Sequence, residues 1–209
     1  MGLLDLLFVH KCRVCNEIIP HGAVCDKCNK LLLEAVDVKS CNFEVLDKTL
    51  HGKYLFEYDN PIVKKLVFAL KRSADRELFE YFAGLYMTVL PKDFSGVITN
   101  VPRRKSSVRE YGYDHVARIC KSLEKMSRGK IRYVPLLKRV GFSKEQKNLT
   151  EKERIKNTKV KFKLKNNDTV NDILLVDDIV TTGNTVISCA KVVLDAKPEA
   201  RLRLAFFAS

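Results

Sequence analysis

The residues best suited to chemistry lie between Ile173 and Thr185, in the sequence ILLVDDIVTTGNT. Its apolar beginning is typical of a strand buried on both faces, and this strand ends in two carboxylates, Asp177 and Asp178. A turn rich in threonine and glycine then leads directly into a predicted helix. Because backbone amides at a helix N-terminus attract anions, this order of elements predicts a phosphate site.

The turn itself would supply the donors to the phosphate. Its amides, its threonine hydroxyls and the close backbone approach that its glycine permits all favour an anion. The two aspartates would repel a phosphate, so a sugar diol or a nearby Mg²⁺ suits them better. A strand, turn and helix in this order by coincidence is the alternative. The predicted residues of the turn are Thr181, Thr182, Gly183, Asn184 and Thr185.

A second group, four cysteines with the spacing C-x2-C-x9-C-x2-C, is suited to a metal. Two tight turns would bring four thiolates to one tetrahedral Zn²⁺, and a shell closed by four sulfurs favours a structural ion over a catalytic one. His10 and His21 lie close enough in the sequence to replace a cysteine, but the four cysteines already complete the shell. Two disulfides or free thiols are the alternative. The predicted ligands are Cys12, Cys15, Cys25 and Cys28.

Positive charge is concentrated in the middle of the chain. The protein has 38 lysines and arginines against 25 aspartates and glutamates, a formal net charge of +13. Between Asn100 and Asn166 there are 21 basic and 6 acidic residues, so this third of the chain holds the whole excess. Such a concentration favours a polyanionic partner, either nucleic acid or a polyphosphate ligand. A solvated lysine-rich surface is the alternative.

Aromatic residues are interleaved with these cations, as a groove for single-stranded nucleic acid requires. Cations would neutralise phosphates and rings would stack on bases, although packing in the core is the alternative for each ring. The predicted nucleic-acid residues are Arg103, Arg104, Lys105, Arg109, Tyr111, Tyr113, Phe142, Lys144, Lys147, Lys152, Arg154 and Lys156.

The composition predicts a soluble globular protein. Of the 209 residues, 46% are hydrophobic and 30% are charged, which is too apolar for a disordered chain, and no apolar run approaches the roughly 20 residues that span a bilayer. The apolar start from Met1 to Val9 lacks a basic region and a cleavage site, so export is not expected. Seven cysteines, an odd number, also favour a reducing cytoplasm over a secreted disulfide framework.

The elements that must position these groups alternate between strand and helix from residue 95 onward, which predicts an α/β domain with a largely parallel, twisted sheet flanked by helices. We expect a zinc-finger segment at 1–45 and this domain at 46–209. A polar stretch from Arg139 to Thr158 is predicted to be a long loop, and loops of that length are typically functional. The predicted strands are 53–58, 96–101, 132–137, 159–164, 173–176 and 201–207, and the predicted helices are 3–8, 26–36, 61–70, 77–90, 113–125 and 185–195.

The thirteen residues from Ile173 to Thr185 closely resemble the phosphoribosyl pyrophosphate (PRPP) motif of type I phosphoribosyltransferases. The resemblance implies the fold of that family. It further implies that Asp177 and Asp178 hydrogen-bond the ribose hydroxyls, that Thr181 to Thr185 hold the 5′-phosphate, and that Mg²⁺ binds together with PRPP.

The basic turn after residue 101 resembles another part of those enzymes, the pyrophosphate-binding loop. Pro102, Arg103 and Arg104 follow a predicted strand there, and the geometry of arginine suits polyphosphate oxygens. The polar loop from Arg139 to Thr158 occupies the position of the mobile catalytic loop of the family, which folds over the ligand.

A zinc knuckle joined to such a domain is similar to the ComF family of bacteria, predicted amidophosphoribosyltransferases associated with DNA uptake. One turn departs from that family, since Tyr111-Gly112-Tyr113-Asp114-His115 stands where Arg-Gly-Phe-Asn-Gln is common, and a basic group and an amide are lost. The segments that match are the cysteine quartet, Tyr58 to Lys71, Val101-Pro102, the series Arg139, Gln146, Arg154 and Asn157, and the PRPP motif.

The likeness to ComF implies a cytoplasmic protein, or one attached at the inner membrane without spanning it, that binds PRPP and handles incoming single-stranded DNA in natural transformation. A competence helicase or an inner-membrane DNA channel would be its protein partner. Two other functions stay open. One is an active phosphoribosyltransferase, in which Asp177, Asp178, Arg103 and Arg104 serve catalysis and the arginines and Mg²⁺ stabilise the departing pyrophosphate. The other is a zinc-stabilised scaffold with a vestigial PRPP pocket.

Overall fold

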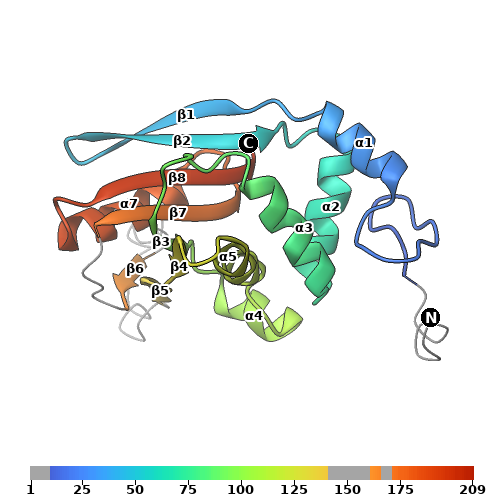
Figure 1. The fold of residues 1–209 in the computed structure, drawn as a ribbon. Coiled ribbons are helices and arrows are strands. Elements are labelled where there is room, and N and C mark those ends of the chain that lie inside the picture. Colours follow the sequence, from blue (N-terminus) through green and yellow to red (C-terminus); the bar gives the residue numbers. More distant parts are fainter. Residues whose placement is uncertain (1–9, 141–160, 166–170) are drawn as a thin grey trace.

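A six-stranded sheet with the order β1-β2-β8-β7-β3-β4 forms the centre of the molecule (Figure 1). The computed structural model describes residues 10–140, 161–165 and 171–209. Within this sheet β1 and β2 pair antiparallel, whereas β2, β8, β7, β3 and β4 pair parallel in turn. The strands of this sheet are β1 (Lys39–Val45), β2 (Lys48–Phe56), β3 (Gly96–Asn100), β4 (Ile131–Tyr133), β7 (Asp172–Ile179) and β8 (Arg201–Ala208). A separate antiparallel pair is formed by β5 (Leu137–Val140) and β6 (Lys161–Leu164).

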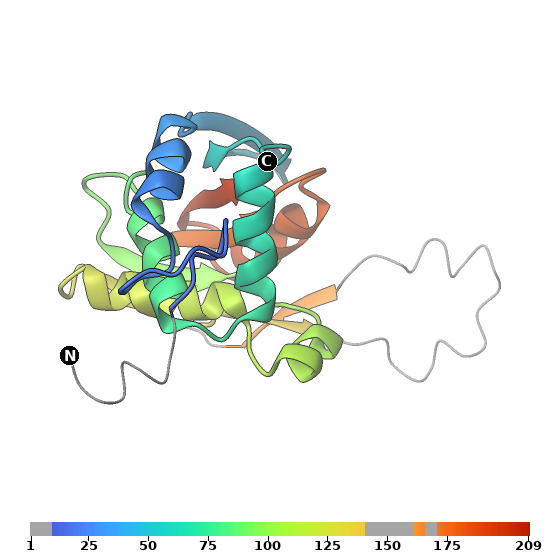
Figure 2. The same cartoon turned by 90° about the vertical axis from the view of Figure 1, so that its right-hand side faces the viewer.

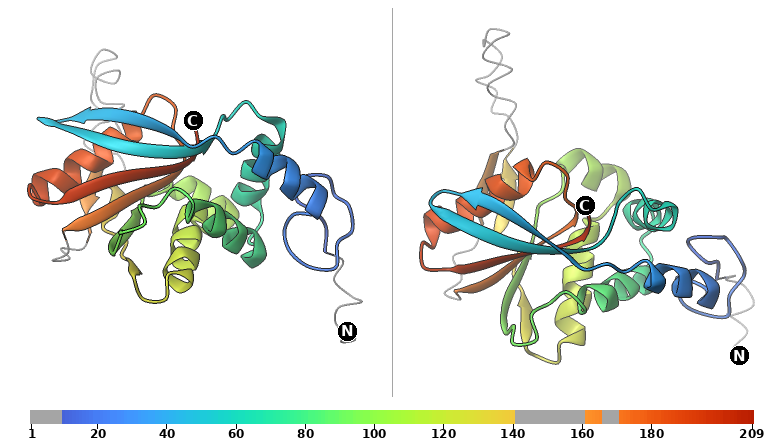
Figure 3. Two further views of the ribbon diagram at one scale, coloured as in Figure 1. Left: turned by 45° about the horizontal axis from the view of Figure 1, so that its top comes forward. Right: turned by 90° about the horizontal axis from the view of Figure 1, so that it is seen from above.

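Helices cover both faces of the sheet, so the predicted α/β class with a mostly parallel sheet is confirmed (Figure 3). Helices α3 and α5 pack on one face, and α7 packs on the other. The helices among the described residues are α1 (Asp26–Glu34), α2 (Pro61–Arg72), α3 (Arg76–Tyr86), α4 (Lys105–Tyr111), α5 (His115–Met126) and α7 (Asn184–Ala196). None of the helices among the described residues is long and apolar enough to cross a membrane.

The central strands explain this two-sided packing, because their side chains are apolar on both faces. In β7 the four residues from Ile173 to Val176 are at most 1% exposed. In β8 the adjacent rings of Phe206 and Phe207 point to opposite faces and enter the two different hydrophobic clusters. The ring centroid of Phe207 lies 4.3 Å from that of Phe82 in α3, which anchors this helix on the sheet.

Side-chain caps set the starts of three helices. Asn60, Asp75 and Asp114 accept hydrogen bonds from the first backbone amides of α2, α3 and α5, respectively. The predicted helix at 113–125 therefore begins two residues later, at His115.

Among the described residues, two elements were not predicted, and two neighbouring strands were predicted as one. Strand β1 and helix α4 are additional, and the predicted strand 132–137 is two strands, β4 and β5, separated by a break at residues 134–136. The predicted helix 3–8 and residues 141–158 of the predicted loop lie outside the described residues.

The N-terminal cysteine segment packs on α2 and α3 (Figure 2). Its buried residues, Cys12 and Val14 among them, belong to the same hydrophobic cluster as the inward faces of these helices. Arg13 also forms an ion pair with Asp75, with 2.6 Å between Nη2 and Oδ2. Strand β1 lies within the expected zinc-finger segment 1–45 but pairs with β2, so the main sheet begins before the expected boundary.

Candidate functional site

A cavity of about 420 Å³ opens where β3 and β7 end. Parallel strands place their carboxyl ends at one edge of a sheet, which is where open α/β folds bind ligands. The cavity brings together six predicted site residues and several that were not predicted. Its lining consists of Lys71, Val101, Pro102, Arg103, Arg104, Ser107, His115, Val116, Arg139, Asp177, Asp178 and Thr185.

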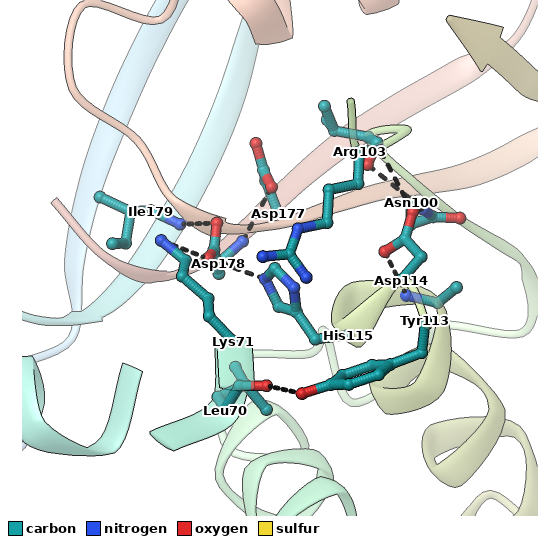
Figure 4. Close-up of polar contacts among 12 residues, drawn as sticks. Leu70, Lys71, Asn100, Arg103, Tyr113, Asp114, His115, Asp177, Asp178 and Ile179 are labelled. Carbon is teal, nitrogen blue, oxygen red and sulfur yellow. Dashed lines mark hydrogen bonds and ion pairs between the residues drawn. The ribbon is translucent and has the colours of Figure 1, made fainter. Parts of the chain in front are cut away.

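Asp178 forms the floor of this cavity together with the side chains of Lys71 and His115 (Figure 4). Its Oδ2 lies 2.9 Å from Nε2 of His115 and 3.0 Å from Nζ of Lys71, and its Oδ1 accepts the amide of Ile179. Burial alone would raise the pKa of Asp178, but the hydrogen bond with His115 and the charge of Lys71 outweigh burial and hold this pKa well below its usual value. Both oxygens of Asp178 are therefore engaged within the protein.

Asp177 has the opposite electrostatic setting. Burial, and then the neighbouring charge of Asp178, raise the pKa of Asp177 well above its usual value. Its backbone carbonyl accepts the hydroxyl of the fully buried Tyr86 in α3, which fixes the end of β7 against the helix. A carboxyl group that retains its proton can donate a hydrogen bond to an oxygen of a ligand. The adjacent aspartates thus have different chemistry, although the sequence treats them alike.

A network around Asp114 shapes the basic turn on the opposite wall (Figure 4). Oδ2 of Asp114 accepts from the side-chain amide of Asn100 and from the backbone amide of Arg103, each at 3.1 Å. Its Oδ1 caps α5 by accepting the amide of Ala117 at 3.2 Å. The hydroxyl of Tyr133 completes the network by donating to Asn100 at 2.8 Å. One carboxylate thus joins the start of α5 to the turn that carries the arginines.

Two buried groups that line the cavity have no hydrogen-bond partner among the described residues, namely Nη1 of Arg103 and Nδ1 of His115. His115 is only 3% exposed, so leaving one of its nitrogens unpaired has a free-energy cost. Arg139 adds a further positive charge and donates from Nε to the carbonyl of Pro102 at 3.1 Å. Burial, and then the charge of Arg104, lower the pKa of Arg139. The cavity can accept an anionic ligand that would satisfy these groups.

The loop between β7 and α7 is placed beside the cavity. Thr185, in the first turn of α7, lines it, whereas Thr181, Thr182 and Asn184 are exposed. Gly183 adopts a φ of 73° and is buried. A Cβ at this position would lie 2.2 Å from Cε1 of Phe43 in β1, so packing against this ring requires glycine there. The sequence pattern had suggested instead that the glycine permits close approach of a ligand.

The predicted nucleic-acid residues divide into three groups. Arg104, Lys105 and Arg109 are exposed around α4, and the guanidinium of Arg103 lies 5.0 Å from the ring centroid of Tyr111. Tyr113 is 6% exposed and donates its hydroxyl to the carbonyl of Leu70, so its ring faces the core and is not available for stacking. Phe142, Lys144, Lys147, Lys152, Arg154 and Lys156 lie outside the described residues.

The four predicted metal ligands meet in the N-terminal segment. The sulfur atoms of Cys12, Cys15, Cys25 and Cys28 all lie within 4.8 Å of one another, and the sulfurs of Cys15 and Cys25 are 3.7 Å apart. Zn–S bonds of about 2.3 Å in a tetrahedron require sulfurs about 3.8 Å apart, so the cluster fits a zinc ion. All four are free cysteines, and 3.7 Å is far longer than a disulfide bond. The donor set is closed and could hold a structural zinc.

Three important contributors to the cavity were missed in the sequence: Lys71, His115 and Tyr86. Lys71 directly follows the predicted helix 61–70, far from the motif, and His115 was noted only as a departure from the ComF pattern. Nothing in the sequence around Lys71 indicates that it pairs with Asp178, because Asp178 is 107 residues away in the chain. The role of this cation becomes visible only once the helix is packed.

Comparison with known proteins gives no assignment. No protein-family model matches the chain, and a search of curated proteins finds no match. Chemically, the cavity combines a cationic wall, a helix N-terminus and one carboxyl group with a raised pKa. This combination suits an anion that also carries hydroxyl groups, such as a sugar phosphate.

Proposed function

We propose that this protein has a type I phosphoribosyltransferase-like fold and binds PRPP in the cavity at the ends of β3 and β7. The main support for the proposal is that one cavity is lined by three arginines together with a threonine and an aspartate, namely Arg103, Arg104, Arg139, Thr185 and Asp177. The two unpartnered buried groups, on Arg103 and His115, support a ligand rich in oxygen.

Each part of the ligand has a counterpart in the cavity. The 5′-phosphate would lie at the N-terminus of α7 near Thr185, and the ribose hydroxyls would face Asp177. The pyrophosphate, with its Mg²⁺, would face Arg103 and Arg104. Asp178 would act indirectly, since it holds Lys71 and His115 in place.

Calorimetric titration with PRPP, with and without Mg²⁺, tests this proposal. A ligand at 100 times its dissociation constant stabilises a protein by about 2.7 kcal/mol, so thermal unfolding gives a second readout. The variant R103Q/R104Q should lose binding, whereas R118Q/K121Q, which removes two charges from the exposed face of α5, should retain it. No heat and no stabilisation with wild type would refute the proposal.

Pyrophosphate release distinguishes the enzyme from a binding protein. In a transferase the bond between the anomeric carbon and pyrophosphate breaks, a bond to an acceptor forms, and the acceptor loses a proton. Release of pyrophosphate that depends on an acceptor would favour the transferase. Binding without release across many acceptors would favour a regulatory pocket, and no binding at all would favour the scaffold.

We also propose a ComF-like role in the cytoplasm, in which the protein handles single-stranded DNA during natural transformation. The exposed cations around α4 support this role, and so does a surface on α2 that the sequence pattern did not single out. Phe68 is 57% exposed with the guanidinium of Arg72 4.1 Å from its ring centroid, and Lys64 and Lys65 lie beside it. Exposed rings among cations suit stacked bases and phosphates.

Salt dependence tests the DNA proposal. Affinity for single-stranded DNA should fall with salt by a logarithmic slope of about −0.7 for each phosphate neutralised, and a flat response would contradict the role of the cations. D177N/D178N should abolish PRPP binding and leave DNA binding intact. Equal loss of both would mean that the two ligands share one site.

We infer finally that the four cysteines hold a structural zinc ion. The sulfur spacing and the docking of this segment on α3 support this inference. The absence of an open coordination position in the set of four favours stability over catalysis.

A further inference from the structure

A second cavity, of about 500 Å³, lies on the sheet face that carries α3, away from the cavity described above. Its floor is formed by β2 and β8, and the segment after α3 forms one wall through Val89 and Pro91. Its volume falls in the range of about 300–1,000 Å³ that is common for small-molecule sites. No residue of the first cavity lines it.

The strand register places basic side chains together on the floor of this second cavity. Lys53 pairs with Ala205 and Leu174 pairs with Arg203, so these four residues share one face. Alternation along each strand adds His51 and Arg201 to the same face. Like charges on neighbouring strands destabilise a sheet unless something compensates them.

Little in the protein compensates these charges. Among the described residues that line the cavity there is no carboxylate, and within the described chain the side chains of Lys53 and Arg201 form no ion pair. Arg203 faces one carboxylate, with 3.6 Å between its Nη2 and Oδ2 of Asp172, and its guanidinium lies 5.6 Å from the ring centroid of Phe94. Both of its terminal nitrogens are nevertheless buried and form no hydrogen bond within the part of the chain that the structure describes.

The rest of the cavity is suited to an organic body. Val89, Pro91 and Leu174 provide apolar surface, and Ser40 and Thr49 add hydroxyl groups, of which that of Thr49 donates to Glu44. An anion alone would need only the basic floor. The combination of a cationic floor, an apolar wall and hydroxyl groups is typical of sites for phosphorylated small molecules.

We propose that this cavity is a second binding site, which takes a small organic phosphate of the size of a nucleoside monophosphate. The phosphate lies against Lys53 and Arg201, the two exposed cations of the floor, and the body of the ligand lies against the wall formed by Val89 and Pro91. The proposal is independent of PRPP binding, because the two cavities share no residue.

Titration of the full chain with AMP, followed by NMR on labelled protein and by calorimetry, tests this site. Amide shifts are expected at Gly52 and Leu204, and shifts confined to 101–104 and 177–185 would overturn the proposal by assigning AMP to the first cavity. The absence of any binding would overturn it as well. Inorganic phosphate and adenosine serve as probes of the two halves of the ligand, and each should bind more weakly than AMP. Inorganic phosphate binding as tightly as AMP would overturn the assignment of an organic ligand.

Matched charge variants make the test specific. K53Q/R201Q removes two exposed cations from the floor, and K121Q/R118Q removes two exposed cations from α5. Loss of charge-assisted hydrogen bonds should weaken AMP binding by about tenfold or more in the first variant and leave it within about twofold in the second. Equal weakening in both would indicate a nonspecific effect of net charge and would overturn the proposal. Because all four side chains are exposed, both variants should fold.

Discussion

Replacing Gly183 by alanine tests how the loop between β7 and α7 is held against β1. The glycine has a φ of 73°, in the left-handed region, where a residue with a Cβ costs about 1–2 kcal/mol. Its new Cβ would lie 2.2 Å from Cε1 and 2.7 Å from Cδ1 of Phe43, and forcing a carbon into a packed region costs about 1–3 kcal/mol. The substitution should therefore destabilise the protein by about 2–5 kcal/mol, which corresponds to a fall in melting temperature of about 4–20 °C for a chain of this length.

Gly112 provides a matched control, because it has a φ of 79° and no other atom lies within 4 Å of the position that an added Cβ would take. G112A should cost only the backbone strain, about 1–2 kcal/mol. In an F43A background, G183A should destabilise the protein by only this smaller amount, since the ring that the new Cβ would contact is absent. Urea denaturation followed by circular dichroism, with zinc present, measures all these differences. Equal destabilisation by G183A and G112A, or no relief in the F43A background, would refute the reasoning.

Three further predictions concern the cavity and the metal. K71M should destabilise the protein by about 1–2 kcal/mol at neutral pH, because the lysine is 35% exposed and the loss is smaller than for a fully buried pair. Since the pKa of Asp178 is depressed, this stabilisation is complete above its unfolded pKa and is lost as the pH falls towards its folded pKa. The gap to wild type in urea denaturation should therefore begin to narrow below about pH 4 and continue to narrow at lower pH. D114A should lower the free energy of unfolding in urea by about 1–2 kcal/mol, because α5 loses its cap. It should also weaken Mg·PRPP binding in calorimetry, because the backbone amide of Arg103 loses its acceptor. Unchanged binding would show that this turn does not contact the ligand. Chelation of zinc, or the substitution C25S, should remove hydrogen-exchange protection from residues 10–36 before it removes protection from β7 and β8. Simultaneous loss of protection throughout the chain would contradict a metal that stabilises only the N-terminal segment.

The turn from Tyr111 to His115 has a positioning role that local sequence did not reveal. Gly112 ends α4 with a positive φ, the hydroxyl of Tyr113 reaches the carbonyl of Leu70, and Asp114 caps α5. His115 then contacts Asp178. These residues therefore position one end of the cavity through contacts within the protein.

Local patterns were sufficient to predict much of the fold. The apolar run before Asp177, the period of α2 and the cysteine spacing each depend on residues close in the sequence, and each leads to the observed element. Strand β1 was missed because its burial alternates only weakly, from half-buried to exposed, and its place in the sheet depends on pairing with β2. The strand predicted at 132–137 is interrupted where Leu136 turns to donate its amide to Thr99, a partner 37 residues away.

The sequence by itself determined which groups are available: the cysteine quartet, the acidic pair before a helix and the arginines after residue 102. Only the tertiary structure decided how the acidic pair is divided, because Lys71 from α2 and His115 from α5 reach Asp178 and leave Asp177 with a raised pKa. The sequence shows which ionisable groups are adjacent in the chain. A pKa follows from neighbours in space, and helix packing brings these together.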